Sequence, residues 1–89
     1  MGSRAKVKVE KLKETVIQGY EKEFKIVIVQ YKQSYKGLSL YKVFAELKYD
    51  GALFDIIDYN VTYNKNKSDR YFSKLESIYP EERLTRKIF

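Results

Sequence analysis

The pair Asp50-Gly51 constrains the fold of this chain more than any other feature, because it predicts a tight turn between two long β-strands. Apolar and polar residues alternate on both sides of the pair, from Leu38 to Tyr63. A two-residue type I′ turn needs positive φ at both central positions, a conformation that Asp-Gly adopts readily. The sequence therefore predicts a β-hairpin in which Tyr49 lies opposite Ala52.

This turn also predicts a register, in which the numbers of any two opposed residues sum to 101. The register puts Lys42 opposite Tyr59, Phe44 opposite Ile57, and Glu46 opposite the like-charged Asp55. Apolar pairs then occur on both faces of the hairpin, so neither face is left in water without cost.

Two further segments precede the hairpin. Residues 23–33 are apolar on both faces, which predicts a central strand, and the polar turn at residues 34–37 returns the chain antiparallel. Residues 5–18 fit a strand that needs a bulge, because apolar residues reappear out of phase at Leu12 and Val16. They also fit a helix, with Ala5, Val9, Leu12 and Val16 on one face. The strand is favoured because many of the residues are β-branched.

A helix is predicted after the hairpin. Ser68 is the expected N-cap, and apolar residues recur at helical spacing from Asp69 to about Tyr79, before Pro80 interrupts the pattern. Residues 80–89 are expected to form a basic tail or a short helix. Residues 1–4 are expected to be disordered or left over from expression. The chain is thus a single small α+β domain over residues 1–89. It has an antiparallel sheet of three to four strands packed on a C-terminal helix, with ββββα favoured and αβββα as the alternative.

The ββββα layout resembles the dimeric single-strand DNA-binding modules of the transcriptional-coactivator type. The αβββα layout resembles a double-stranded RNA-binding domain. The last helix of that family begins with a Lys- and Ala-rich stretch, however, and the sequence here, NKNKSDRYFSKLES, contains no alanine. Both resemblances concern architecture alone, and each implies a nucleic-acid ligand.

The absence of cysteine and histidine excludes most catalytic and metal-binding arrangements. Glu46-Leu47-Lys48 matches the end of a metal-dependent nuclease motif, but no Asp precedes Glu46 to supply the first metal ligand. The chain is therefore not expected to be an enzyme or to hold a metal or cofactor. The alternative is a histidine-free ribonuclease, which would use the C-terminal residues Arg70, Tyr71, Arg83, Arg86 and Lys87. With no signal peptide and no long apolar run, a cytoplasmic location without a membrane partner is expected.

Charge and tyrosine content lead to the functional prediction. The formal net charge is +6, and its excess lies in the two ends of the chain, since residues 26–63 carry four bases and four acids. Nine tyrosines offer rings for base stacking. We expect a small protein that binds nucleic acid, single-stranded DNA or RNA rather than duplex, as a homodimer. The expected contact residues are Lys6, Lys8, Lys11, Lys13, Lys42, Phe44, Tyr59, Arg70, Arg83, Arg86 and Lys87.

The alternative function is a protein-binding regulator or inhibitor, from a virus or mobile element, that acts through a spare sheet face. The neutral hairpin favours this alternative, whereas the basic ends favour nucleic acid.

Overall fold

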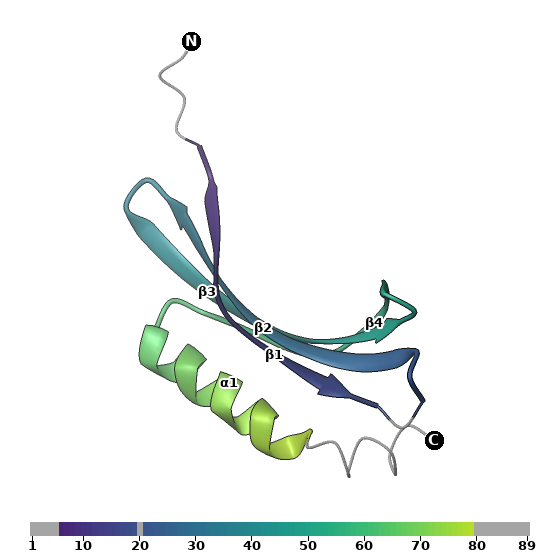
Figure 1. The fold of residues 1–89 in the computed structure, drawn as a ribbon. Coiled ribbons are helices and arrows are strands. Elements are labelled where there is room, and N and C mark those ends of the chain that lie inside the picture. Colours follow the sequence, from purple (N-terminus) through teal and green to yellow (C-terminus); the bar gives the residue numbers. More distant parts are fainter. Residues whose placement is uncertain (1–5, 20, 80–89) are drawn as a thin grey trace.

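The computed structural model describes residues 6–19 and 21–79, which form one antiparallel sheet and one helix (Figure 1). The elements are β1 (Lys8–Gln18), β2 (Phe24–Tyr35), β3 (Leu38–Tyr49), β4 (Ala52–Thr62) and α1 (Lys65–Ile78). The strands lie in the order β1-β2-β3-β4. The predicted ββββα fold of the α+β class is confirmed, and the αβββα alternative is wrong. The expectations for residues 1–4 and 80–89 concern parts of the chain outside the described residues.

Strand β1 contains the bulge that its sequence requires. Lys11 pairs with Tyr31 and Lys13 pairs with Gln30, so Leu12 is an extra residue on β1. Because a bulge shifts the side-chain alternation by one position, Ile17 faces the same side as the core residue Ile26, with which it pairs. The bulge therefore brings an irregular apolar pattern into register with a regular sheet.

The two hairpins are closed by two-residue turns whose backbones have positive φ. Asp50 and Gly51 have φ of 53° and 85°, and Lys36 and Gly37 have φ of 49° and 79°. Positive φ at both positions identifies each turn as type I′, which matches the twist of the flanking strands. The predicted turn at Asp50-Gly51 is thus confirmed.

The predicted register of the β3–β4 hairpin holds only next to the turn. Tyr49 pairs with Ala52 and Lys48 with Leu53, but β4 then carries two bulges, at Phe54 and at Ile57. Beyond both bulges Phe44 pairs with Tyr59, Lys42 with Val61 and Ala45 with Asp58, so the predicted pairs Lys42–Tyr59 and Phe44–Ile57 are wrong. Glu46 lies opposite Ile56, which removes the predicted like-charge pair with Asp55.

Packing explains both bulges. The first places Phe54 against Phe24 and Tyr49, with ring centroids 6.3 and 6.5 Å apart, and the second lets Ile57 pack against the core. The bulges also leave backbone amides to be satisfied locally: the Ile56 amide donates to the carboxylate of Asp55 at 2.8 Å.

The helix begins four residues earlier than predicted. Asn64 is the N-cap, and its side-chain oxygen accepts a hydrogen bond from the Lys67 amide at 3.0 Å. Ser68, predicted as the cap, lies fully buried inside α1, where its hydroxyl accepts a hydrogen bond from the Gln30 side chain at 2.8 Å. Both residues are good caps by type, so burial of Ser68 against β2 decided between them.

The core lies between α1 and one face of the sheet. Phe72 and Leu75 of the helix pack on alternate residues of the two central strands, which are Ile26, Ile28, Val43, Ala45 and Leu47. β2 is thus the central strand that its sequence predicts, and alternation sends its remaining side chains to the opposite face. In Figure 1 the sheet curves away from α1, so the face opposite α1 is the inner side of the curve.

Candidate nucleic-acid interface

The open face, by which we mean the sheet face opposite α1, is rich in exposed apolar side chains. Strand pairing and alternation assign nine exposed residues to it: Val9, Val16, Tyr35, Leu38, Leu53, Ile56, Tyr59, Val61 and Tyr63. At its centre Val29 is only 2% exposed although α1 lies on the other face, because Glu14 and Phe44 flank Val29 on the neighbouring strands. An apolar surface of this extent is typical of an interaction site.

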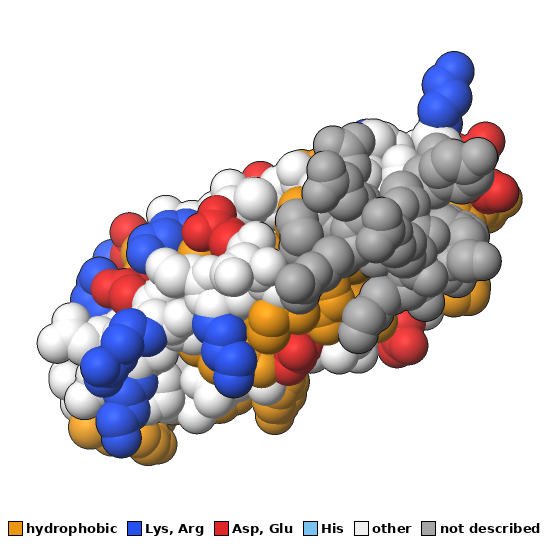
Figure 2. All heavy atoms as spheres, turned by 90° about the horizontal axis from the view of Figure 1, so that it is seen from below, with side chains coloured by type: hydrophobic (Ala, Val, Ile, Leu, Met, Phe, Trp, Pro, Cys, Tyr) orange, Lys and Arg blue, Asp and Glu red, His pale blue; other side chains and the backbone are white. Residues whose placement is uncertain are grey.

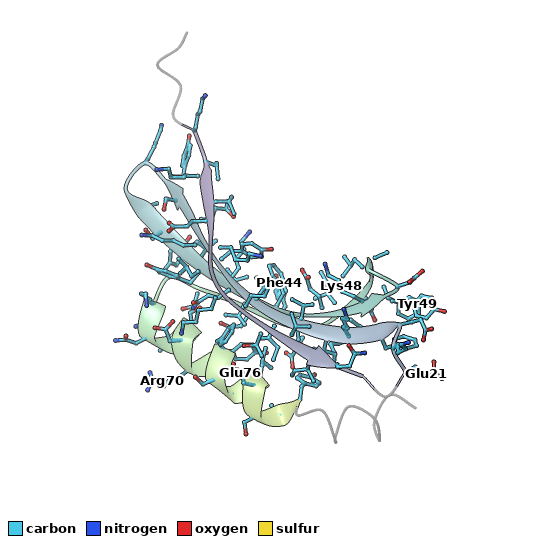
Figure 3. All side chains as sticks on the ribbon, viewed as in Figure 1. Glu21, Phe44, Lys48, Tyr49, Arg70 and Glu76 are labelled. Atoms are coloured by element: carbon cyan, nitrogen blue, oxygen red, sulfur yellow. The ribbon has the colours of Figure 1, made fainter. Side chains whose placement is uncertain are left out.

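Three aromatic side chains form a row across the middle of the open face. The Tyr31 and Phe44 ring centroids are 6.1 Å apart, and those of Phe44 and Tyr59 are 5.5 Å apart, both with edge-to-face geometry. Each ring comes from a different strand, β2, β3 or β4, and Tyr59 is 56% exposed. Figure 3 shows Phe44 on the sheet and α1, with Arg70 and Glu76, on the other side. The aromatic row therefore offers ring surface to a ligand on the open face.

Charge is distributed unevenly along the open face. In the strand pairing Lys11 and Lys42 lie on either side of Tyr31, and Lys36 lies in the β2–β3 turn. The end of the open face next to the β2–β3 turn, which we call the hairpin end, is therefore basic. Lys11 also forms an ion pair with Glu14 at 3.3 Å. Toward the Asp50-Gly51 end the open face is balanced, with Glu46 3.8 Å from Lys48. The excess of positive charge on the open face therefore lies next to the β2–β3 turn.

A hollow of about 170 Å³ opens at this hairpin end of the open face. Its lining residues come from β2, from β3 and from the residue that follows β4: Gln33, Tyr35, Leu38, Leu40 and Tyr63. The lining includes no Asp, Glu, Lys or Arg side chain. Lys36 lies at the rim, with its ammonium nitrogen 5.4 Å from the centre of the Tyr35 ring. The hollow is thus apolar and aromatic, with one amide and an adjacent cation.

The structure brings only some of the predicted contact residues together. Lys11, Lys42, Phe44 and Tyr59 share the open face, whereas Lys8 and Lys13 point to the helix side and Arg70 is exposed on α1. Lys6 is exposed just before β1. Arg83, Arg86 and Lys87 lie outside the described residues. Sequence reasoning missed five residues of this candidate site, Tyr31, Gln33, Tyr35, Lys36 and Tyr63. For all of them but Lys36 a signal existed, because strand alternation puts them on the same sheet face as Phe44 and Lys42 once the strands are paired.

Lys13 holds the helix to the sheet. Its ammonium nitrogen is 3.3 Å from the Asp69 carboxylate and 5.3 Å from the centre of the Phe72 ring. The Asp69 carboxylate also accepts hydrogen bonds from Lys65 at 2.9 Å and from Gln30 at 3.0 Å. These partners, Lys65 first, lower the pKa of Asp69 from 3.8 to about 2. Figure 2 shows that Lys and Arg side chains also gather on the α1 side, at the end of the molecule where the helix begins.

Tyr71, one of the residues considered for catalysis, has a structural partner. The Tyr71 hydroxyl donates a short hydrogen bond to the Asp58 carboxylate, and the Tyr79 hydroxyl donates to the same group at 3.5 Å. Burial, reinforced by Asp58, raises the pKa of Tyr71 to about 12. Among residues 6–19 and 21–79 no three acidic side chains converge on a point where a metal could bind.

Comparison with known proteins found no match, whether with a family model, a curated protein or a solved structure. The resemblance to single-strand DNA-binding modules that the sequence suggested has no support from these comparisons. In the described part of the chain, α1 is too short and too polar to cross a lipid bilayer.

Proposed function

We propose that this protein binds single-stranded nucleic acid, DNA or RNA, on the open face of its sheet. The observation that carries the proposal is the aromatic row of Tyr31, Phe44 and Tyr59, which lies beside Lys42 and Lys11. Aromatic rings stack on any base, and each base stacked contributes about 1–3 kcal/mol to the binding of single strands. Lysines beside the rings supply the phosphate contacts that such binding also needs.

The face suits a single strand better than a duplex. Its rings lie on a sheet that curves away from α1, so the ligand has to present unpaired base faces toward the strands. In a duplex those base faces are stacked on one another, and sequence readers of intact DNA place a helix or ribbon in a groove instead. DNA and RNA both present unpaired bases and phosphates to this face, so the proposal includes both.

A labelled oligonucleotide of twelve thymidines, titrated at two salt concentrations, tests the proposal. Affinity should fall as salt rises, because each neutralised phosphate releases a counterion and contributes about −0.7 to the logarithmic slope for a single strand. Replacing Lys42 by Gln should reduce that slope by about 0.7. Lys74→Gln is the matched control, since Lys74 is an exposed lysine on α1. Tyr59→Leu should weaken binding, and Tyr59→Phe should not, because phenylalanine keeps the ring.

Two results would contradict the proposal. One is the absence of binding by the wild-type protein even at low salt. The other is an equal effect of Lys42→Gln and Lys74→Gln, which would mean that binding follows net charge and not the open face.

A protein partner, in the first place a second copy of this chain, is the second candidate. The Asp50-Gly51 end of the open face favours it, because Leu53 is 56% exposed, Val16 55% and Ile56 45%. Exposed aliphatic side chains without excess charge suit a protein surface more than a phosphate backbone. The mass in solution at micromolar concentration, with and without the oligonucleotide, separates the candidates. A dimer that ignores the oligonucleotide supports the protein interface, and a monomer that gains the mass of one oligonucleotide supports the first proposal alone.

A further inference from the structure

We infer that the hollow lined by Gln33, Tyr35, Leu38, Leu40 and Tyr63 is a pocket for a single unstacked nucleobase. The inference rests on the proposed function and adds to it a particular subsite on the open face, at the hairpin end and separate from the aromatic row.

The lining has the chemistry of a base pocket. Tyr63 is 71% exposed and Tyr35 is 41% exposed, so both rings are available for stacking, while Leu38 and Leu40 supply apolar surface. Gln33 contributes an amide that both donates and accepts hydrogen bonds, as the edge of a base requires. Within the described chain no hydrogen bond engages this amide. A flat, uncharged ring with a polar edge therefore matches the hollow better than a charged group or a flexible aliphatic chain does.

The size and the charge around the hollow also fit this ligand. Its volume of about 170 Å³ is several times the roughly 30 Å³ that one water molecule occupies in the liquid. Lys36 lies at the rim, and Lys42 follows Leu40 on the same face of β3. A base inserted in the hollow would thus carry its phosphates past two cations. The described residues that line the hollow include no carboxylate to repel them.

The hollow and the aromatic row lie on one path. Gln33 and Tyr31 are successive open-face residues of β2, and Leu40 and Phe44 are two such steps apart on β3, so the hollow and the row are about 7–14 Å apart at roughly 3.4 Å per residue. A nucleic-acid strand rises about 3.4 Å per nucleotide when its bases are stacked. Strands of about four or more nucleotides should therefore reach both sites, and dinucleotides should reach only one.

The test compares variants of the full chain in binding labelled homopolymers of twelve thymidines, cytidines and adenosines. Tyr63→Ala should weaken binding about tenfold or more, and Tyr63→Phe should bind as the wild type does. Tyr49→Ala is the control, because Tyr49 is 45% exposed at the opposite end of the hairpin. Gln33→Leu should reduce the differences in affinity among the three homopolymers, since the amide is the group in the hollow that can both donate to and accept from the edge of a base. Tyr63 follows β4 and is largely exposed, so its replacement should leave folding intact, as a thermal melt can verify.

The outcomes separate this inference from the function on which it rests. If Tyr63→Ala binds like the wild type while Lys42→Gln and Tyr59→Leu bind more weakly, the base pocket is refuted and single-strand binding stands. If Tyr49→Ala weakens binding as much as Tyr63→Ala does, the pocket is also refuted. If the wild-type protein binds none of the three homopolymers at low salt, both proposals fail.

Discussion

Replacing Leu75 by Ala removes the contact that most firmly joins α1 to the sheet. Leu75 is fully buried, and it packs in the same cluster as Ile28 and Val43. Truncation of a buried leucine costs about 2.7–5 kcal/mol, because the transfer free energy of the removed atoms is lost and the cavity left behind closes only in part. A domain of this length has a free energy of unfolding of about 4–13 kcal/mol, at 0.05–0.15 kcal/mol per residue. The substitution should therefore remove a large fraction of the total stability.

Urea unfolding followed by far-ultraviolet circular dichroism measures the effect. With an m-value of about 1–1.5 kcal/mol per molar urea, the midpoint should fall by roughly 2 M or more. Leu75→Met keeps most of the side-chain volume, and it should cost less than about 1.5 kcal/mol. Val16→Ala is the control on the open face, where the side chain is 55% exposed, and it should cost far less than Leu75→Ala.

Comparing the stability lost in Leu75→Ala with that lost in Val16→Ala tests which face of the sheet holds the core. A loss for Leu75→Ala no larger than that for Val16→Ala would refute the argument that the helix side holds the core. If Leu75→Ala does not fold at all, Leu75 is a core position, because an exposed position would tolerate alanine. Leu75→Met then still folds, because it keeps most of the side-chain volume.

Three further predictions concern groups outside the proposed interface. The pKa of Asp69 in the folded protein is lowered to about 2, so the contribution of this carboxylate to stability is present above its ordinary pKa near 4 and is lost as the pH falls toward 2. Asp69→Asn should therefore flatten the acid side of a curve of unfolding free energy against pH. The pKa of Tyr71 in the folded protein is raised to about 12, so the contribution of its hydrogen bond to Asp58 is complete below pH 10 and is lost toward pH 12. Tyr71→Phe should therefore reduce the loss of unfolding free energy at alkaline pH, measured in the same titration. Gly51→Ala should cost about 1–2 kcal/mol in urea unfolding although nothing lies within 4 Å of the added carbon, because an L-residue is strained at a φ of +85°; a neutral result would contradict the type I′ turn.

Local features of the sequence predicted the main turn and the central strand correctly. Asp50-Gly51 specified its turn because few residue pairs adopt positive φ twice in succession. The two-faced apolar pattern of residues 23–33 predicted a central strand, which the structure has as β2 (Phe24–Tyr35). The out-of-phase apolar residues around Leu12 predicted a bulge for the strand interpretation of residues 5–18 and also allowed a helix, and the structure has the bulged strand. Each of these preferences acts between near neighbours in sequence.

Contacts between distant residues decided the register, the helix start and the composition of the site. The bulges at Phe54 and Ile57 move the partner of Phe44 by two residues, from Ile57 to Tyr59, and thereby build the aromatic row. Their cause is packing against Phe24, Tyr49 and the core, which the sequence of β4 alone does not reveal.

The sequence by itself determined an antiparallel sheet of three to four strands with a C-terminal helix, a basic chain and a surplus of tyrosines, and the structure decided that residues 8–18 are the fourth strand. Only the tertiary structure decided which tyrosines meet which lysines. The physical reason is that alternation assigns side chains to two faces but does not say which face a helix will cover. In the structure Phe72 and Leu75 pack α1 over the face of Ile26 and Ile28, and the rings of Tyr31 and Phe44 are left on the open face.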